Sequence, residues 1–230
     1  MPKTDKQKQK KQMKKRRKDK ARKQSSGSTG PNSQVGLIKA SRKFPVVDCF
    51  INSNWKSDEE VGINNSSSLV RIVITREAPD GLLVWGSFLV DMLLLGVKDA
   101  HAMAEITPNQ LKEALDHVYP DGPYEPCDLA LAHQIIYQGI DYAAKYDITP
   151  HSDFKLARNV LDKRGTHPEE HELTFGRDGK PIFVQGPYDN VDLIMSKLER
   201  TAGEGNYDYI LIAGGDFDDD IEIYDDDDTN

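Results

Sequence analysis

The stretch LVRIVITREAPDGLLVWGSFLV, residues 69–90, sets the fold class of this chain. Both of its halves are rich in branched and other large apolar side chains, which favour β-strands. Pro79, Asp80 and Gly81 separate the halves with residue types that form tight turns. The stretch therefore predicts a β-hairpin made of residues 69–76 and 82–90.

Further β signals flank this hairpin. The segment FPVVDCFI, residues 44–51, predicts a strand before it. Nearer the C-terminus, residues 171–175 and 181–185 predict a second hairpin around an Asp-Gly turn. Residues 207–213 predict a last strand.

Helical patterns fill the regions between these β segments. They predict helices at residues 92–104, 108–118, 126–146, 150–162 and 189–200. The second of these has the clearest start, because Thr107 can cap it, proline suits its first position and Gln110 can complete a capping box. The order of strands, helices, strands, helix and strand predicts an α+β fold: a single compact domain of antiparallel hairpins with a central run of helices.

The length and composition indicate one folded unit with two tails. The chain has 230 residues, of which 37% are hydrophobic, so it can bury one modest core. We expect a basic arm and linker at residues 1–34, an α+β globular domain at 35–215 and an acidic tail at 216–230. Neither tail has enough apolar side chains to offset the entropy of ordering, so we expect both to be disordered.

Charge is distributed unevenly along the chain. Residues 1–24 hold thirteen Lys and Arg and two Asp, which gives +11, and residues 216–230 hold eight Asp and one Glu, which gives -9. The whole chain carries -8, so subtracting both ends leaves -10 for residues 25–215. A body of that sign is not a general nucleic-acid binder, whereas the arm suits phosphate groups. The phosphate-binding residues that we expect in the arm are Lys14, Lys15, Arg16, Arg17, Lys18, Lys20, Arg22 and Lys23.

Several protein classes are disfavoured by the sequence. No run approaches the ~20 apolar residues that cross a bilayer, and no apolar segment of a secretory signal follows the N-terminal lysines. Cys49 and Cys127 are the two cysteines, too few for a disulfide scaffold or a four-cysteine zinc site. We therefore expect a cytoplasmic protein that does not associate with membranes.

The best candidate cluster for catalysis joins two predicted helices. His133 lies on the helix at 126–146, and His151 and Asp153 stand at the start of the next helix. Imidazole and carboxylate groups can exchange protons with a substrate or hold a divalent ion. In the structural alternative, His133 makes a buried hydrogen bond and the charge of Asp153 stabilises a helix N-terminus. Both interpretations stay open at this stage.

Residues 167–171, HPEEH, match the H-x-x-E-H pattern of a zinc-protease class in which one helix presents two histidines to the metal. Gly165 ends a predicted helix just before this motif, and Pro168 lies inside it. No helix is therefore expected to hold His167 and His171 together. We expect a polar surface loop there, with no metal and no cofactor.

Asp91 borders the apolar segment between the first hairpin and the helix predicted after it. A carboxyl group in such surroundings can have a raised pKa that suits proton transfer. A capping role explains the residue more simply, because no charged partner is evident in the sequence.

Four segments carry a resemblance to other proteins. LVDMLLLGVKDA (89–100), IIYQGIDYA (135–143), PHSDF (150–154) and GPYDN (186–190) resemble segments of a group of uncharacterised bacterial proteins. The resemblance would cover about residues 45–213. It implies a bacterial, cytosolic origin and no particular activity.

Three functions compete on these observations. The leading hypothesis is a non-enzymatic binding or adaptor protein, whose basic arm engages RNA or DNA phosphates, alone or in a ribonucleoprotein, while the acidic body docks another partner. The first alternative is a small hydrolase or nuclease that uses His133, His151 and Asp153. The second is a regulatory scaffold in which the arm and the tail pair through their charges.

Charge attraction between arm and tail leads to a testable expectation. The tail should compete with nucleic acid for the arm, most strongly at low ionic strength, because salt screens exposed charges over ~8 Å under physiological conditions. Deleting residues 216–230 should then tighten RNA or DNA binding in dilute buffer, and deleting residues 1–24 should abolish it. Filter binding of the two deletions and the full chain measures this. Equal affinities of the full chain and the tail deletion at low salt would refute competition by the tail.

Overall fold

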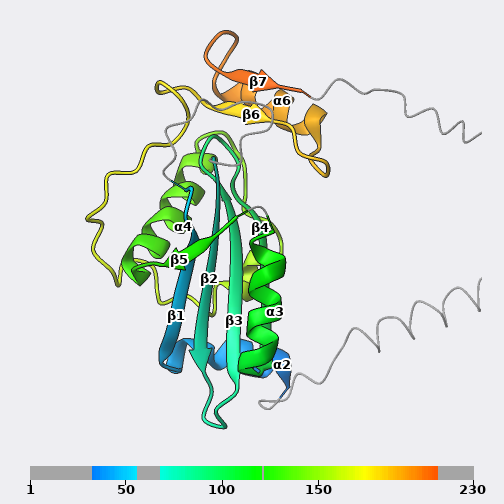
Figure 1. The fold of residues 1–230 in the computed structure, drawn as a ribbon. Helices are drawn as coiled ribbons and strands as arrows, with labels where there is room; N and C mark the ends of the chain where they lie inside the picture. Colours follow the sequence, from blue (N-terminus) through cyan, green and yellow to red (C-terminus); the bar gives the residue numbers. More distant parts are fainter. Residues whose placement is uncertain (1–32, 56–67, 121, 212–230) are drawn as a thin grey trace, which may run out of the picture.

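Five antiparallel strands form the central sheet, in the order β4-β3-β2-β1-β5 (Figure 1). Their bounds are Val46–Asn52 for β1, Leu69–Glu77 for β2, Leu83–Asp91 for β3, Gly96–Ile106 for β4 and Tyr124–Pro126 for β5. This sheet and its helices make the body α+β, as the order of sequence signals predicts. The computed structural model describes residues 33–55, 68–120 and 122–211, so the expected disorder of the two tails concerns residues outside these ranges.

The hairpin predicted at the start is confirmed as β2 and β3. Their register pairs Val73 with Ser87, and the turn closes with a hydrogen bond from the Gly81 amide to the Ala78 carbonyl, at 2.9 Å. Alternate residues of β2 point to opposite faces: Ile72 and Ile74 enter the larger core, whereas Val73 enters a second one. Both faces of the sheet are therefore covered by helices.

The larger core lies under α2 (Gln34–Ala40), α4 (Leu129–Ala144) and α5 (Phe154–Ala157). A short 3-10 helix, η1 (Ser41–Lys43), links α2 to β1. The second core lies under α3 (Pro108–Val118), whose Leu111 and Leu115 pack against sheet residues such as Trp85. The predicted capping box of α3 is confirmed: Thr107 accepts the Gln110 amide, and the Gln110 side chain accepts the Thr107 amide at 3.0 Å.

The helix predicted at residues 92–104 is wrong. Residues 92–95 form a turn in which Asp91 Oδ1 accepts the amides of Leu93 and Leu94, and strand β4 begins at Gly96. Ala100 and Ala104 face the core, whereas Asp99 and His101, on either side of Ala100, are exposed. Alanine favours a helix, so the pairing of this segment with β3 overrides its local preference.

The helix predicted at residues 150–162 shrinks to the single turn of α5. Side chains from elsewhere take the backbone carbonyls that a longer helix would use: Ser41 donates to Asn159, Arg42 to Leu161 and Arg76 to Val160. These hydrogen bonds are 2.9, 2.8 and 2.6 Å long. The chain leaves helical geometry because its acceptors are occupied from outside.

The second predicted hairpin, of residues 171–175 and 181–185, is also wrong. A bridge joins Arg177 to Lys180 around the expected Asp-Gly turn, but residues 171–175 form no strand. Strand β6 (Ile182–Val184) instead pairs in parallel with β7 (Asp208–Ile210), and α6 (Val191–Thr201) connects them. Backbone groups of His171 bond to the side chain of Gln134 on α4, which replaces strand pairing.

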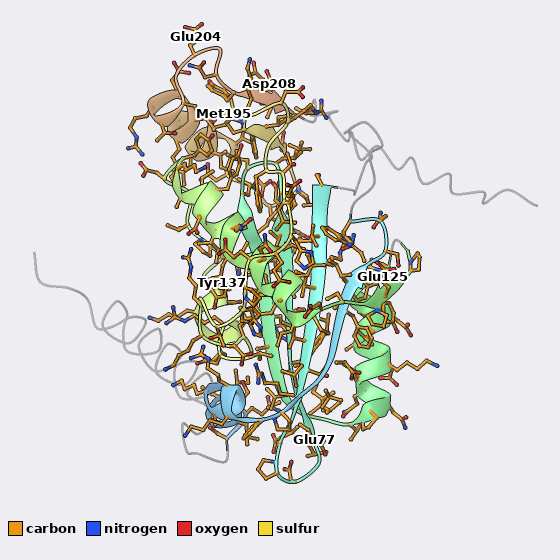
Figure 2. All side chains as sticks on the ribbon, turned by 90° about the vertical axis from the view of Figure 1, so that its left-hand side faces the viewer. Glu77, Glu125, Tyr137, Met195, Glu204 and Asp208 are labelled. Carbon is orange, nitrogen blue, oxygen red and sulfur yellow. The ribbon has the colours of Figure 1, made fainter. Side chains whose placement is uncertain are left out.

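The β6-α6-β7 unit packs at one end of the molecule. Phe183 and Leu198 from this unit meet Leu94, Leu95 and Ala143 in a third core. Figure 2 shows Glu204 and Asp208 at this end, Tyr137 midway along the molecule and Glu77 at the opposite end. The third core therefore joins the unit to the turn before β4 and to the end of α4.

Gly96 gives a direct test of how closely α4 approaches the sheet. A Cβ at Gly96 would lie 2.5 Å from the Gly139 carbonyl oxygen, and its φ is +60°; Gly81 has a φ of +79° but nothing within 4 Å. Gly81→Ala should therefore lose only the strain of a left-handed residue, about 1 kcal/mol. Gly96→Ala should lose a further 1–3 kcal/mol, roughly, from overpacking. Urea unfolding measures both, and equal losses would contradict the close approach.

Candidate functional site

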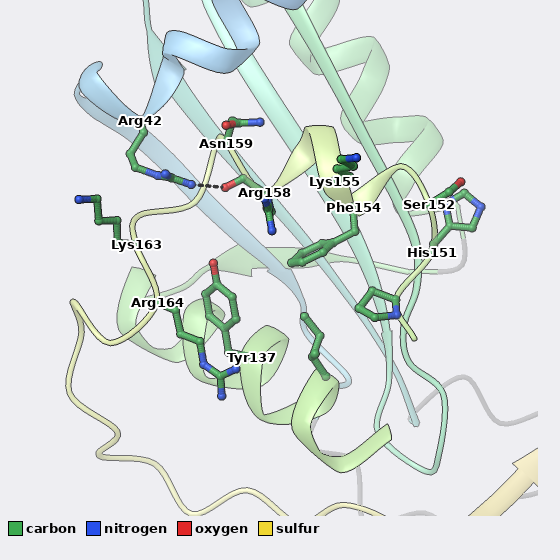
Figure 3. A pocket seen from close by; sticks show the side chains of 12 residues that line it. Arg42, Tyr137, His151, Ser152, Phe154, Lys155, Arg158, Asn159, Lys163 and Arg164 are labelled. Atoms are coloured by element: carbon green, nitrogen blue, oxygen red, sulfur yellow. Dashed lines mark hydrogen bonds between the residues drawn. The ribbon is translucent and has the colours of Figure 1, made fainter. Parts of the chain in front are cut away.

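A pocket of about 650 Å³ opens between α4, α5 and the segment that follows α5 (Figure 3). Arg42 reaches it from η1, Tyr137 and Ile140 from α4, and Phe154 from α5. Figure 3 shows the Tyr137 and Phe154 rings between the basic side chains. The remaining lining residues are Pro150, His151, Ser152, Lys155, Arg158, Asn159, Lys163 and Arg164.

The charge of this pocket opposes that of the body around it. Residues 25–215 hold 17 Lys and Arg, which are the 30 of the whole chain less the thirteen of residues 1–24. Five of these 17 line the pocket, and no Asp or Glu among the described residues does. A concave surface lined by charges of one sign focuses the electrostatic field on a ligand of the opposite sign. The pocket is therefore suited to an anion.

Three of the five cationic side chains are exposed and free to bind an anionic ligand. Lys155, Arg158 and Lys163 are exposed, and none of them forms an ion pair with a residue in the ranges that the structure describes. Arg42 is held in place, because its Nε donates to the Leu161 carbonyl at 2.8 Å and its Nη2 to the Arg158 carbonyl at 2.9 Å.

Arg164 has a different set of partners. It pairs with Asp141 and lies over the Tyr137 ring, 5.5 Å from its centroid. A planar aromatic ring beside guanidinium groups can stack on a base or another flat group.

His133 lies in a neighbouring cluster with Asp162 and His167. The Nε2 of His133 accepts the Asp162 amide at 3.1 Å, and the Nε2 of His167 donates to Asp162 Oδ2 at 2.9 Å. Burial, together with the charge of His167, lowers the pKa of His133 to about 4, so its imidazole is neutral at pH 7. Although partial burial opposes it, the hydrogen bonds from His167 and Arg76 hold the pKa of Asp162 below its usual range.

The same three residues are the metal-ligand set that the geometry offers. Their donor atoms lie within 4.8 Å of one another. Each donor already has a partner in the chain, however: Arg76 binds Asp162 Oδ1 at 2.7 Å, and the hydrogen bonds above engage His133 and His167. The buried Arg76 charge also opposes a second cation there. The arrangement acts as a hydrogen-bonded link between β2, α4 and residues 162–167.

The three candidate catalytic residues do not meet in one cavity. His151 lines the basic pocket, whereas His133 lines a small adjacent cavity together with His167. The Asp153 amide lies 3.4 Å from His151 Nδ1, but Asp153 lines neither cavity. Their joint catalytic role therefore stays a prediction from sequence, and His133 makes the buried hydrogen bond of the structural alternative.

The other motifs have structural settings. His167 of the H-x-x-E-H segment belongs to the cluster with His133 and Asp162, whereas His171 is not part of that cluster and bonds through its backbone to Gln134. Burial raises the pKa of Asp91 to about 6, and its carboxylate caps the turn before β4, in line with the capping role that the sequence favours as the simpler explanation. The eight basic residues expected to bind phosphate, Lys14 to Lys23, lie outside the described ranges.

The basic pocket itself was missed by the charge analysis of the sequence. The segment KLARNVLDKR, residues 155–164, holds four of its five cations and one acid, Asp162. That acid is bound by Arg76 and His167, so the local excess of positive charge was a usable signal.

The pKa of His133 predicts how its burial affects stability with pH. An unfolded histidine takes up a proton near pH 6.5, whereas the folded protein resists protonation of His133 until about pH 4. Stability contributed by neutral His133 is therefore complete above pH 6.5 and is lost as pH falls towards 4. His133→Gln keeps a side-chain acceptor but does not titrate. Its free energy of unfolding should therefore fall less between pH 6.5 and pH 4 than that of the wild-type protein, by roughly 3 kcal/mol. Urea unfolding of both proteins from pH 4 to 7.5 measures the difference; parallel curves would show that His133 titrates normally.

Comparison with known proteins adds no family: no family model, curated protein or solved structure matches the chain. Within the described ranges, no helix is both long and apolar enough to cross a membrane.

Proposed function

We propose that this chain is a nucleic-acid-binding protein that holds phosphate groups in the basic pocket and along its N-terminal arm. The observation that carries the proposal is the gathering of five Lys and Arg in one pocket of a body whose net charge is -10. Cations gathered at one concave surface raise the local concentration of anionic ligands there. In a nucleic acid, the groups that Lys and Arg side chains bind most directly are the backbone phosphates.

Nucleic acid fits the pocket better than an isolated inorganic anion does. A volume of about 650 Å³ is large compared with one phosphate group and lies in the range of nucleotide-sized ligands. Arg164 lies over one face of the Tyr137 ring, and its guanidinium plane can itself stack on a base that follows the phosphate.

The position of the arm supports the same ligand. Residues 1–24 are joined to α2 through the short segment 25–33, and α2 leads through η1 to Arg42 in the pocket. The nine residues between the arm and α2 can span at most about 30 Å. A strand with one phosphate in the pocket therefore has others within reach of the arm.

The pocket changes the expected effect of removing the arm. Because Lys155, Arg158 and Lys163 belong to the folded body, deletion of residues 1–24 should weaken binding and leave a residual affinity that depends on these three side chains. Loss of all binding would assign the whole function to the arm.

A matched pair of charge reversals tests the pocket. Lys163→Glu places a negative charge in it, whereas Lys112→Glu makes the same change on the exposed side of α3, under the other face of the sheet. Because each lost phosphate contact lowers the salt slope of binding by about 1, Lys163→Glu should weaken binding roughly threefold to tenfold in low salt and flatten that slope.

Fluorescence anisotropy with single-stranded RNA and DNA oligonucleotides, across a salt series, measures this effect. Far-ultraviolet circular dichroism checks that both variants keep the fold. Equal weakening by Lys163→Glu and Lys112→Glu would show that only net charge matters and would overturn the role of the pocket.

A further inference from the structure

The two cysteines lie opposite each other at one edge of the sheet, Cys49 on β1 and Cys127 directly after the end of β5. The β1–β5 register pairs Phe50 with Pro126, which places Cys49 opposite Cys127, and the Cys127 amide donates to the Cys49 carbonyl at 2.9 Å. Their sulfur atoms are 2.9 Å apart, although the residues are 78 positions apart in sequence. Such proximity between distant positions comes from the fold.

This geometry is close to that of a disulfide. A disulfide bond is about 2.05 Å long, so the sulfur atoms need to approach by only about 0.9 Å. Paired residues of adjacent antiparallel strands have Cα separations inside the range that disulfides span. Rotation of the side chains can therefore close the bond without moving the sheet.

We propose that Cys49 and Cys127 are a modification site, at which a low-molecular-weight disulfide such as oxidised glutathione converts the two thiols into an intramolecular disulfide. This site lies on the β1–β5 edge and does not rest on the proposed nucleic-acid function.

The reaction proceeds by two thiol–disulfide exchanges. The Cys127 thiolate attacks one sulfur of oxidised glutathione, forms a mixed disulfide and releases one glutathione thiolate, which takes up a proton. The Cys49 thiol then loses its proton and attacks Cys127 Sγ, releasing the second glutathione as a thiolate that takes up that proton. Two protein thiols are oxidised, and one glutathione disulfide is reduced to two thiols.

The surroundings set the order of these steps. Cys127 is half-buried and Cys49 is buried, so the external disulfide reaches Cys127 first. The neighbouring Cys127 sulfur and burial raise the pKa of the Cys49 thiol well above its usual range. Cys49 therefore acts as the resolving residue. Its sulfur lies so close to Cys127 Sγ that it attacks the mixed disulfide before a second glutathione can do so.

The bond would fix an edge that is weakly held. Strand β5 has three residues and, among the described strands, pairs only with β1. Tyr124 of β5 stacks on Tyr119 at the end of α3, with 4.8 Å between ring centroids. Oxidation would lock β5 and this aromatic pair against β1.

The test treats the full chain with oxidised glutathione, blocks residual thiols with iodoacetamide and measures the intact mass. We expect the wild-type protein to lose the mass of two hydrogens, to gain no glutathione and to resist alkylation. Cys127→Ser should form no internal disulfide. Cys49→Ala should stop at the mixed disulfide on Cys127, and this separates the two roles even if one variant is less stable.

Thermal unfolding of the wild-type protein gives a second measurement. The disulfide closes a long loop in the unfolded chain, so oxidation should raise the melting temperature by several degrees, and a reductant should reverse the rise. Two alkylated thiols after treatment, a stable glutathione adduct on the wild-type protein, or disulfide-linked dimers would each overturn the proposal.

Discussion

A single buried guanidinium ties together the segments that build the pocket. Arg76 is 3% exposed, and its nitrogens donate to the Val160 carbonyl at 2.6 Å, the Phe44 carbonyl at 2.7 Å and the Asp162 carboxylate at 2.7 Å. A buried charge is tolerated only when it is paired and hydrogen-bonded. Strand β2, the residues before β1 and the turn after α5 must therefore assemble together. Because Asp162 also bonds His167, the same constraint positions the histidine cluster.

The features predicted correctly are those whose causes lie within a few residues. The turn at Gly81, the cap at Thr107 and the apolar stripe of α4 are all local. In each case the interaction that sets the conformation can be read without knowing what packs on it.

The failures have causes far away in the chain. The carbonyls that end α5 are bound by side chains between 84 and 119 positions away, so the pattern of residues 150–162 contains no sign of them. Residues 99–105 alternate alanine with larger and mostly polar side chains at a period of two, which is typical of a strand, but alanine and methionine also favour a helix. The Asp-Gly turn predicted a hairpin between neighbouring segments. Strand β6 instead pairs in parallel with β7, a pairing that requires the intervening helix α6 as a crossover.

The site was predictable in part for the same reason. His151 and the cations of residues 155–164 are close in sequence and line one pocket, but Arg42 arrives from η1 and Tyr137 from α4. His133 was correctly identified as a candidate for burial, yet its partners Asp162 and His167 are set by Arg76, a contact that no spacing rule reveals. The net charge of residues 25–215 gave no indication of the basic pocket, because a sum over these residues contains no information on where each charge lies.

The acidity of the body then determines how the basic pocket can be used. Outside the pocket, residues 25–215 hold twelve of their 17 Lys and Arg against 27 Asp and Glu, which are the 38 of the chain less the eleven of its ends. A polyanion lying across the other faces meets repulsion that increases with each phosphate. Its favourable contacts are confined to the pocket and to the arm that joins the body at α2. Under the proposed function, a short or terminal stretch of nucleic acid would satisfy both contacts while avoiding the acidic surface, so the proposal places the pocket and the arm on the same strand.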